Sequence, residues 1–254
     1  MKRIVLVIAF VATIFSAQAW TKVVCDASYL ITEKYMTEAA KAECNRILAL
    51  KESVDYKWVA DKAAKVSLDA SLLSTTADEN DIVVRIEKAA EVLRNRANHS
   101  DEEQYKALLT LRNLLPELHT ISRIAIEGVE HSQSDFEFTW TAGKEGSKKH
   151  EKRGKTTWHR IWSNSFCSWH QGWSSEYYAY DINLRFGKFR EQAMQGSVRD
   201  WAHEMGLRAK PLYDWVSPGM LMRHEPRLIL EDTHLEMVAR AGYRLAALLN
   251  ECLK

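Results

Sequence analysis

The first half of the chain carries apolar residues at the spacing of an amphipathic helix. Two such stripes follow Thr76–Glu79 and Ser100–Glu103, in which a hydroxyl caps the first turn and a Glu three positions later reaches back to the cap residue. We therefore predict helices over 77–97 and 100–118 that close on each other as an antiparallel hairpin. Their apolar positions are Ile82, Ile86, Ala90 and Leu93, then Tyr105, Leu108, Leu111, Leu115 and Leu118.

Two more helices are predicted before this hairpin, over 33–50 and 54–73. Both stretches are rich in Ala, Lys and Leu and contain neither Gly nor Pro. The first carries an apolar stripe of Met36, Ala40, Cys44 and Ile47, so we expect the Cys44 side chain to face inward.

Near residue 124 the pattern changes to alternation of apolar and polar positions, which predicts β-strands. We expect one strand at Ile124 and Ile126, a second through Phe136, Phe138 and Trp140, and two more over 158–166 and 178–186. Because the connections are short and polar, the strands are predicted to form an antiparallel meander with one covered face.

Helical spacing returns after the strands. A helix is predicted over 189–205 with Gly206 as its C-cap, and Thr233–Glu236 is predicted to open the last helix. The fold class is therefore α+β: an N-terminal bundle of about four helices (20–122), then a three- or four-stranded antiparallel meander covered by C-terminal helices (123–254). No linker marks residue 122, so the two regions can also form one continuous domain.

The first nineteen residues are typical of a secretory signal peptide. Lys2 and Arg3 precede an apolar run over 4–16, and Ala17-Gln18-Ala19 matches the pattern that signal peptidase cuts. Val24 before Cys25 excludes a lipoprotein anchor, and no later run is long and apolar enough to span a bilayer. Removing 19 of the 254 residues leaves 235, and we expect a soluble periplasmic or secreted protein.

Export changes how the four cysteines are interpreted. In an oxidising compartment an even number of cysteines predicts two disulfides, of which we favour Cys25–Cys44 and Cys167–Cys252, with Cys44–Cys252 as the alternative. The chain has no CxxC, no CxxCH and no Cys/His cluster at zinc spacing. Redox, haem and structural-zinc functions are therefore disfavoured, and we expect no cofactor and no metal.

Charge is divided unevenly along the chain. Residues 20–137 hold 15 Lys and Arg against 21 Asp and Glu, a net −6, whereas residues 138–254 hold 18 against 13, a net +5. The mature chain is close to neutral, so no global field draws it to nucleic acid or membrane, and any electrostatic partner must be local.

A basic, glycine-rich loop is predicted between the second and third strands. Cations beside aromatic faces suit phosphate- or sugar-bearing polymers, because cations meet anions and rings stack on bases or sugars. A solvated hairpin tip and a core of strand aromatics would explain the same residues. The candidate binding residues are Lys148, Lys149, Lys152, Arg153, Trp158, Trp162, Trp169 and Trp173.

Polar residues suggest a second kind of site around His159, His170, Asp181 and the pair His203-Glu204. A strand, a strand and a helix carrying His170 and His203-Glu204 superficially resembles the ββα-metal nucleases, which implies a His that activates water. The helix lacks the Asn of that motif. HExxH, GxSxG, GxGxxG and phosphate-loop motifs are absent from the sequence, and Glu176 with Asp181 is a conceivable glycosidase pair.

Two functions follow as hypotheses. The first is an exported binding or interaction protein that engages an anionic envelope polymer or an acidic protein partner through the basic aromatic hairpin. The alternative is an exported hydrolase of phosphodiester or glycosidic bonds, with His170, His203 and Glu204 as its catalytic residues.

Overall fold

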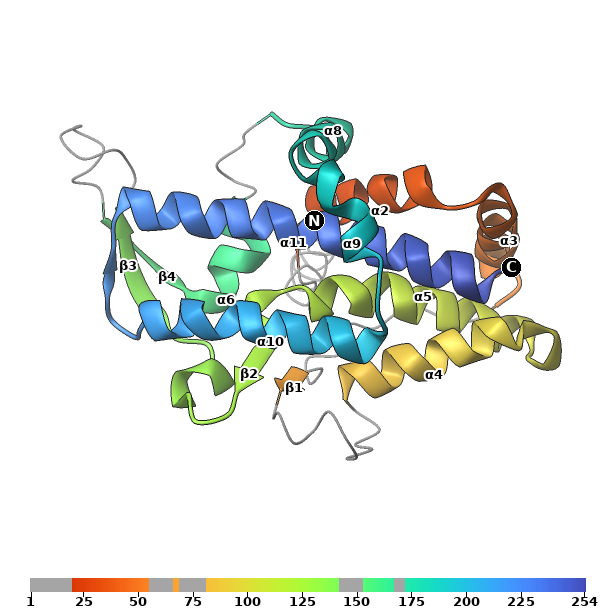
Figure 1. Cartoon of the computed structure of the whole chain (residues 1–254), viewed down its shortest axis with the longest axis horizontal. Coiled ribbons are helices and arrows are strands. Elements are labelled where there is room, and N and C mark those ends of the chain that lie inside the picture. Colours follow the sequence, from red (N-terminus) through yellow and green to blue (C-terminus); the bar gives the residue numbers. More distant parts are fainter. Residues whose placement is uncertain (1–19, 55–65, 69–80, 142–152, 167–171) are drawn as a thin grey trace, which may run out of the picture.

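The computed structural model describes residues 20–54, 66–68, 81–141, 153–166 and 172–254. This part of the chain is mostly helical, with a small sheet at one end of the molecule (Figure 1). The mixed α+β composition predicted from the sequence is confirmed. No helix in these ranges is both long and apolar enough to cross a membrane.

The helix predicted over 33–50 is two helices, α2 (Lys22–Tyr35) and α3 (Glu38–Ala49). The chain is extended at Met36 and Thr37, and the Thr37 hydroxyl accepts a hydrogen bond from the Ala40 backbone N–H at 3.2 Å, which starts α3. The inward stripe through Cys44 is confirmed, since all four of its residues are buried.

The helix predicted over 54–73 is wrong where the structure describes it. Val66–Leu68 forms a short strand, β1, that pairs in parallel with β2 (Ile124–Ile126). The remainder of that stretch, 55–65 and 69–73, lies outside the described residues. The predicted helix therefore contains a strand: Val66 and Ser67 are weak helix formers, and the three residues gain a backbone ladder with a distant segment.

The predicted helical hairpin is confirmed as α4 (Ile82–Arg94) and α5 (Asp101–Leu118), which lie against each other (Figure 1). At α5 the capping box forms as expected, with Glu103 reaching back to the Ser100 backbone N–H at 2.8 Å. At α4 the cap is Asp81, which accepts a hydrogen bond from Val83 N–H at 2.7 Å. The predicted cap at Thr76 lies outside the described residues. All nine apolar positions of the two stripes are buried.

The sheet is mixed, and the purely antiparallel meander is wrong. Strand β3 (Glu137–Thr141) lies between β4 (Arg153–Thr157), which is antiparallel to it, and β5 (Leu221–Met222), which is parallel to it. The sequence pattern missed β5, because a two-residue strand carries no periodicity.

The strands predicted over 158–166 and 178–186 are helical. Residues Trp158–Arg160 form α6, which continues into a π-helical turn at Ile161–Ser165, and α8 spans Ser175–Phe186. The Thr157 hydroxyl caps α6 by accepting from the Arg160 N–H at 3.2 Å. Both stretches are rich in Trp and Tyr, whose β-propensity is weak enough for packing to override.

The C-terminal helices differ from their predicted boundaries. The stretch 189–205 is interrupted, with α9 (Arg190–Ala193) ending before α10 (Val198–Trp215). Ser197 caps α10 together with Asp200, and the helix runs on through Gly206 and Pro211. The last helix, α11 (His224–Cys252), begins well before Thr233, whose hydroxyl donates to the Ile229 carbonyl within the helix at 2.8 Å.

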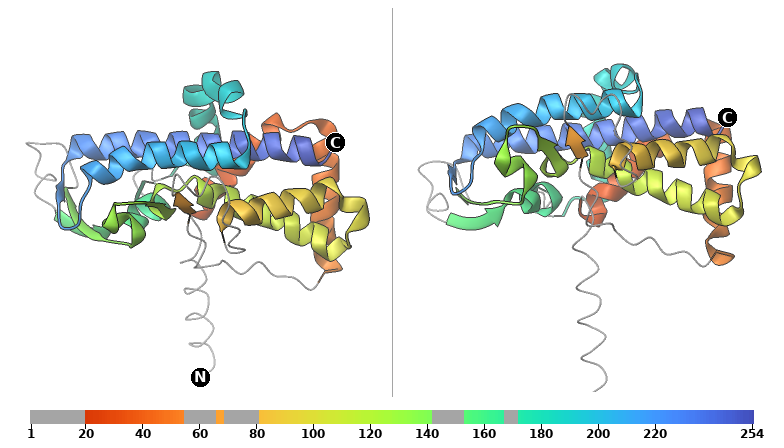
Figure 2. Two further views of the ribbon diagram at one scale, coloured as in Figure 1. Left: turned by 60° about the horizontal axis from the view of Figure 1, so that its bottom comes forward. Right: turned by 90° about the horizontal axis from the view of Figure 1, so that it is seen from below.

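Helix α11 is long and central, and α2, α4, α5 and α8 all pack against it (Figures 1 and 2). Where α2 crosses it, a Cβ built on Gly242 would lie 2.8 Å from Ile31 Cγ2, so only glycine permits this approach. The Thr32 hydroxyl also donates to the Gly242 carbonyl at 3.1 Å. The main core unites residues from α4, α5, α6, α10 and α11, and a smaller cluster fills the junction of α2, α8 and α11.

The predicted disulfides are not formed among the described cysteines. Cys25, Cys44 and Cys252 are free and buried, and Cys167 lies outside the described residues. Cys25 packs in the smaller cluster, whereas Cys44 and Cys252 belong to the main core, so the fold separates Cys25 from Cys44. Burial raises the pKa of the Cys25 thiol to about 12 and the pKa of Cys44 and of Cys252 to about 11, so all three are neutral.

Candidate functional site

The basic hairpin exists as the antiparallel pair of β3 and β4, with Thr141 opposite Arg153 at its outer end. Its connecting loop, 142–152, lies outside the described residues, and this loop contains Lys148, Lys149 and Lys152. The cationic cluster therefore stays a prediction. Within the described strand, the Lys155 side chain is exposed.

Two of the tryptophans predicted to flank the hairpin lie in the core. Trp158 and Trp162 are each 1% exposed, and their rings meet edge to face at 5.4 Å between centroids. Trp158 also stacks on Phe136 at 5.6 Å. Because both tryptophans lie on a helical turn that packs beneath the sheet, their faces are not available to a ligand. Trp169 lies outside the described residues.

Trp173 lies just before α8, at one end of a row of aromatic rings that continues along the helix. Its ring meets Tyr177 edge to face at 4.7 Å, and Tyr177 lies 6.5 Å from Tyr180 between centroids. Tyr177 is 49% exposed and Tyr180 is 65% exposed, while Trp173 is half-buried. We call Trp173, Tyr177 and Tyr180 the α8 aromatic strip.

Helical geometry explains why the two tyrosines share one face, because positions 177 and 180 are three residues apart on α8. Trp173 precedes the N-cap residue Ser174, and its ring meets both Tyr177 and the buried Tyr178, the latter at 4.9 Å between centroids. The Ser174 hydroxyl starts the helix by accepting from the Tyr177 N–H at 3.3 Å. Tyr178 and Ile182 point the other way and are buried against α2 and α11. The strand interpretation had placed Tyr178 and Tyr180 on one face, whereas the helix separates them.

Helix α8 stands at the edge of the molecule, and its strip continues into further apolar surface. In Figure 2 this helix projects beyond the layer formed by α10 and α11. Leu184, one turn after Tyr180, is 68% exposed. Beyond it, Arg185 pairs with Asp232 of α11 and borders a shallow cavity of about 490 Å³ that Leu228 and Ile229 also line.

Carboxylates flank the strip without forming a catalytic pair. Glu176 is exposed, and hydrogen bonding to Ser174 lowers its pKa, so it is ionised at neutral pH. Asp181 pairs with Arg185 at 3.7 Å. Glu176 and Asp181 are five residues apart on one helix, which turns them about 140° from each other at 3.6 residues per turn.

The two residues of the predicted catalytic pair on α10 have different surroundings: His203 faces solvent, and Glu204 lies in a cluster of arginines. His203 is exposed. Glu204 pairs with Arg208 at 2.7 Å, with Arg240 at 2.8 Å, and with Arg244. Burial alone would raise the pKa of Glu204, but the charge of Arg244, the hydrogen bond from Arg208 and the charge of Arg240 outweigh it and lower the pKa to about 2. Glu204 is therefore a permanent anion that neutralises arginines.

His119, which the sequence did not single out, lies fully buried at the end of this arginine cluster. Its Nδ1 lies 2.7 Å from the Leu115 carbonyl, and its Nε2 lies 2.9 Å from Arg244 Nη1. Burial, and then the charge of Arg244, lower the pKa of His119 to about 3, so the ring is neutral and accepts from the guanidinium. The pattern of residues near α5 offered no signal for this contact, because Arg244 is 125 residues away.

His159 is held at the start of α6 beside a serine. Its Nδ1 lies 3.1 Å from Ser122 Oγ, and its backbone N–H donates to Asp135 Oδ1 at 2.7 Å. Burial and the charge of Arg123 lower the pKa of His159 to about 4. Asp135 thus holds the backbone and not the ring, which distinguishes this pair from a Ser-His-Asp triad. His170 lies outside the described residues.

Comparisons with known proteins add no assignment. No protein-family model matches the sequence, and no curated protein matches it significantly. Among the described residues, no group of three or more His, Cys, Asp and Glu side chains could hold a metal ion.

Proposed function

We propose that this protein is an exported binding protein that engages a sugar-bearing polymer along the α8 aromatic strip. One observation carries the proposal: two tyrosine rings that are about half or more exposed lie on one face of a projecting helix, and the half-buried Trp173 lies just before that helix. The proposed export rests on the N-terminal nineteen residues, which have the pattern of a signal peptide.

The shape of the strip favours a linear chain over a flat protein partner. The strip is one helix wide and is flanked by Glu176 and Asp181, whereas a stable protein interface needs about 800 Å² on each side with an apolar centre. One turn of helix rises 5.4 Å, so successive rings offer stacking platforms along the axis. The carboxylates can accept hydrogen bonds from sugar hydroxyls.

A polymer that also carries negative charge would make a second contact, an electrostatic one, with the basic hairpin of β3 and β4. Lys155 of β4 is the described cation of that hairpin, and the lysine-rich loop precedes it in the sequence. Stacking and charge pairing respond differently to salt, because only the second releases counterions. Salt dependence therefore separates the two contributions.

The test is co-sedimentation of the mature protein with purified cell-wall sacculi in 50 mM and 500 mM NaCl. We expect binding, and we expect Tyr177→Ala and Tyr180→Ala each to weaken it about tenfold, taking the ~1–3 kcal/mol of a base stacked on an aromatic ring as the scale. Trp215→Ala is the matched control, because Trp215 is 39% exposed but lies on α10. Undiminished binding by both tyrosine variants would exclude the strip as the site.

The hydrolase alternative stays a prediction, and the contact of Ser122 with His159 is the observation that favours it. A hydroxyl hydrogen-bonded to a neutral imidazole is the arrangement of an activated nucleophile and its base. In the same experiment, soluble fragments released from sacculi and lost in Ser122→Ala would identify a hydrolase. Binding without release would favour the binding protein.

A further inference from the structure

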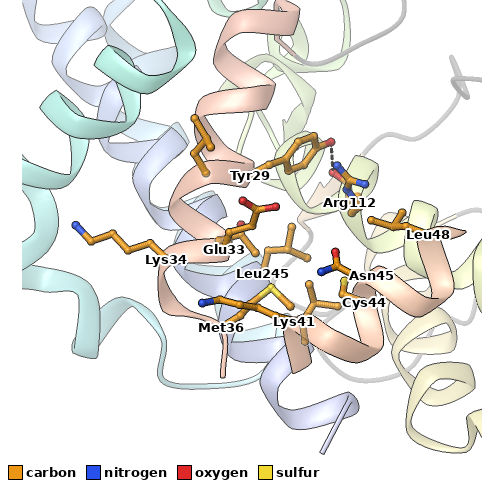
Figure 3. Close-up of a pocket in the computed structure, with 13 residues that line it drawn as sticks. Tyr29, Glu33, Lys34, Met36, Lys41, Cys44, Asn45, Leu48, Arg112 and Leu245 are labelled. Carbon is orange, nitrogen blue, oxygen red and sulfur yellow. Dashed lines mark hydrogen bonds between the residues drawn. The ribbon is translucent and has the colours of Figure 1, made fainter. Parts of the chain in front are cut away.

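A cleft of about 470 Å³ lies between α2, α3, α5 and α11 (Figure 3), and no residue of the α8 aromatic strip lines it. At about 30 Å³ for each water in the liquid, it has room for roughly fifteen water molecules. This is within the range of pockets that hold small organic ligands. Nothing in the proposed function uses it.

The floor of the cleft is apolar. Met36, Leu245 and Leu249 line it and are at least 93% buried. Cys44 is the fourth floor residue, and its thiol is neutral because burial raises its pKa. An apolar group placed on this floor would leave water without exposing any buried charge.

Opposite charges stand on the walls above this floor. Arg112 of α5 is positioned by Tyr29: its guanidinium lies 4.4 Å from the Tyr29 ring centroid, and the Tyr29 hydroxyl donates to the Arg112 carbonyl at 2.9 Å. Glu33 lies one turn along α2 from Tyr29, and Figure 3 shows its carboxylate on the same side of the helix. Glu33 and Arg112 both line the cleft.

The two lysines of the cleft are engaged or directed elsewhere. Lys41 pairs with Glu38 at 2.8 Å. Lys34 extends away from the other labelled residues in Figure 3, and its ammonium lies 5.6 Å from the Tyr35 ring centroid. The charges that face a ligand are thus one guanidinium and one carboxylate.

We propose that this cleft binds a small zwitterion with an apolar side chain, which is the chemistry of a free amino acid or a short peptide. The ligand's carboxylate pairs with Arg112, its ammonium pairs with Glu33, and its side chain lies on the floor of Met36, Leu245 and Leu249. A simple anion would meet repulsion from Glu33, and a simple cation would meet repulsion from Arg112. Only a ligand that carries both charges can pair with Arg112 and with Glu33.

Isothermal titration calorimetry of the mature protein with leucine and with leucyl-leucine tests this assignment and separates the two sources. We expect saturable binding of at least one of them. N-acetylation or C-terminal amidation of the ligand that binds should weaken it at least tenfold, because each removes one charge. Equal binding by a blocked ligand, or no binding by either free ligand, would overturn the proposal.

Variants locate the binding in the cleft. Glu33→Gln and Arg112→Gln should each weaken binding at least tenfold, whereas Lys22→Gln should leave it unchanged, because Lys22 is an exposed lysine at the start of the same helix and does not line the cleft. Glu33 is exposed, so its substitution keeps the test valid even if Arg112→Gln does not fold. Unchanged affinity in Glu33→Gln, or equal loss in Lys22→Gln, would place the ligand elsewhere.

Discussion

Arg244 shows what burial demands of a single charged side chain. It is 1% exposed, and its guanidinium donates to the Ala193 carbonyl at 3.0 Å, to His119 at 2.9 Å and to Glu204. Burial lowers its pKa to about 10, and the charge of Glu204 opposes that change, so the guanidinium stays protonated at neutral pH. A buried charge is tolerated only when it is paired and hydrogen-bonded, and here one histidine, one carboxylate and one carbonyl meet that requirement.

The neutral His119 predicts how stability depends on pH. Its pKa is about 3 in the folded protein against 6.5 for an ordinary histidine, so between these values the unfolded chain binds the extra proton. The contribution of His119 to stability is complete above pH 6.5 and is lost as pH falls towards 3. We expect His119 alone to lower the free energy of unfolding by about 2 kcal/mol between pH 7 and pH 5.

Urea unfolding of wild type and His119→Gln at pH 7, 6 and 5 measures this effect. The variant should lose about 2 kcal/mol less across that range. His203→Gln is the control, because it removes a histidine from an exposed position on α10. Glu204 does not interfere, since its lowered pKa affects stability only below about pH 4.5. Parallel curves for wild type and His119→Gln would contradict a neutral, buried His119.

At the scale of elements, the crossing of α2 over α11 depends on one glycine. Gly242 lies inside α11, where glycine is intrinsically unfavourable by about 1 kcal/mol relative to alanine. Its place is explained by contact: a Cβ there would lie 2.8 Å from Ile31 Cγ2 and 2.9 Å from the Ser28 carbonyl oxygen. Close packing of two backbones thus outweighs local propensity.

Gly242→Ala should therefore destabilise the protein even though alanine favours helix. We expect a loss of roughly 1–3 kcal/mol, the usual effect of overpacking a core, measured by urea unfolding. Gly187→Ala is the matched control, because its Cβ would meet Asn183 at an ordinary 3.7 Å. A Gly242→Ala protein as stable as wild type would mean that α2 does not approach α11 this closely.

At the scale of the whole molecule, the fold leaves its described cysteines unpaired and out of solvent. Cys25 belongs to the smaller cluster, and Cys44 and Cys252 lie in the main core. An oxidising compartment does not oblige such thiols to pair, because oxidation requires access and a thiolate. Their neutral, buried state accounts for free cysteines in a chain that carries a signal peptide pattern.

Thiol titration checks this arrangement. The native protein, purified without reductant, should react slowly with a thiol reagent at Cys25, Cys44 and Cys252. After unfolding in guanidinium, still without reductant, at least three thiols per chain should react rapidly. Two or fewer would show that a disulfide involving these residues had formed, as the sequence alone had suggested.

Local patterns predicted those parts of the fold that local interactions decide. The capping box at Ser100 and the apolar stripes of α4 and α5 are short-range features, and the structure has them where they were expected. The stretches 158–166 and 178–186 were mistaken for strands because aromatic residues suit both strands and buried helices. The same error hid the exposed Tyr180 as a candidate ring, because its exposure follows from the helix.

The sequence by itself indicated the signal peptide pattern, the helical hairpin and the mixed class of the fold, since each depends on residues close together in the chain. Only the tertiary structure decided which rings are exposed, which thiols are free, and that Arg112 and Glu33 border one cleft. Those properties arise where α2, α5, α8 and α11 meet. Contacts between residues far apart in sequence leave no periodic trace along it, so packing alone could reveal them.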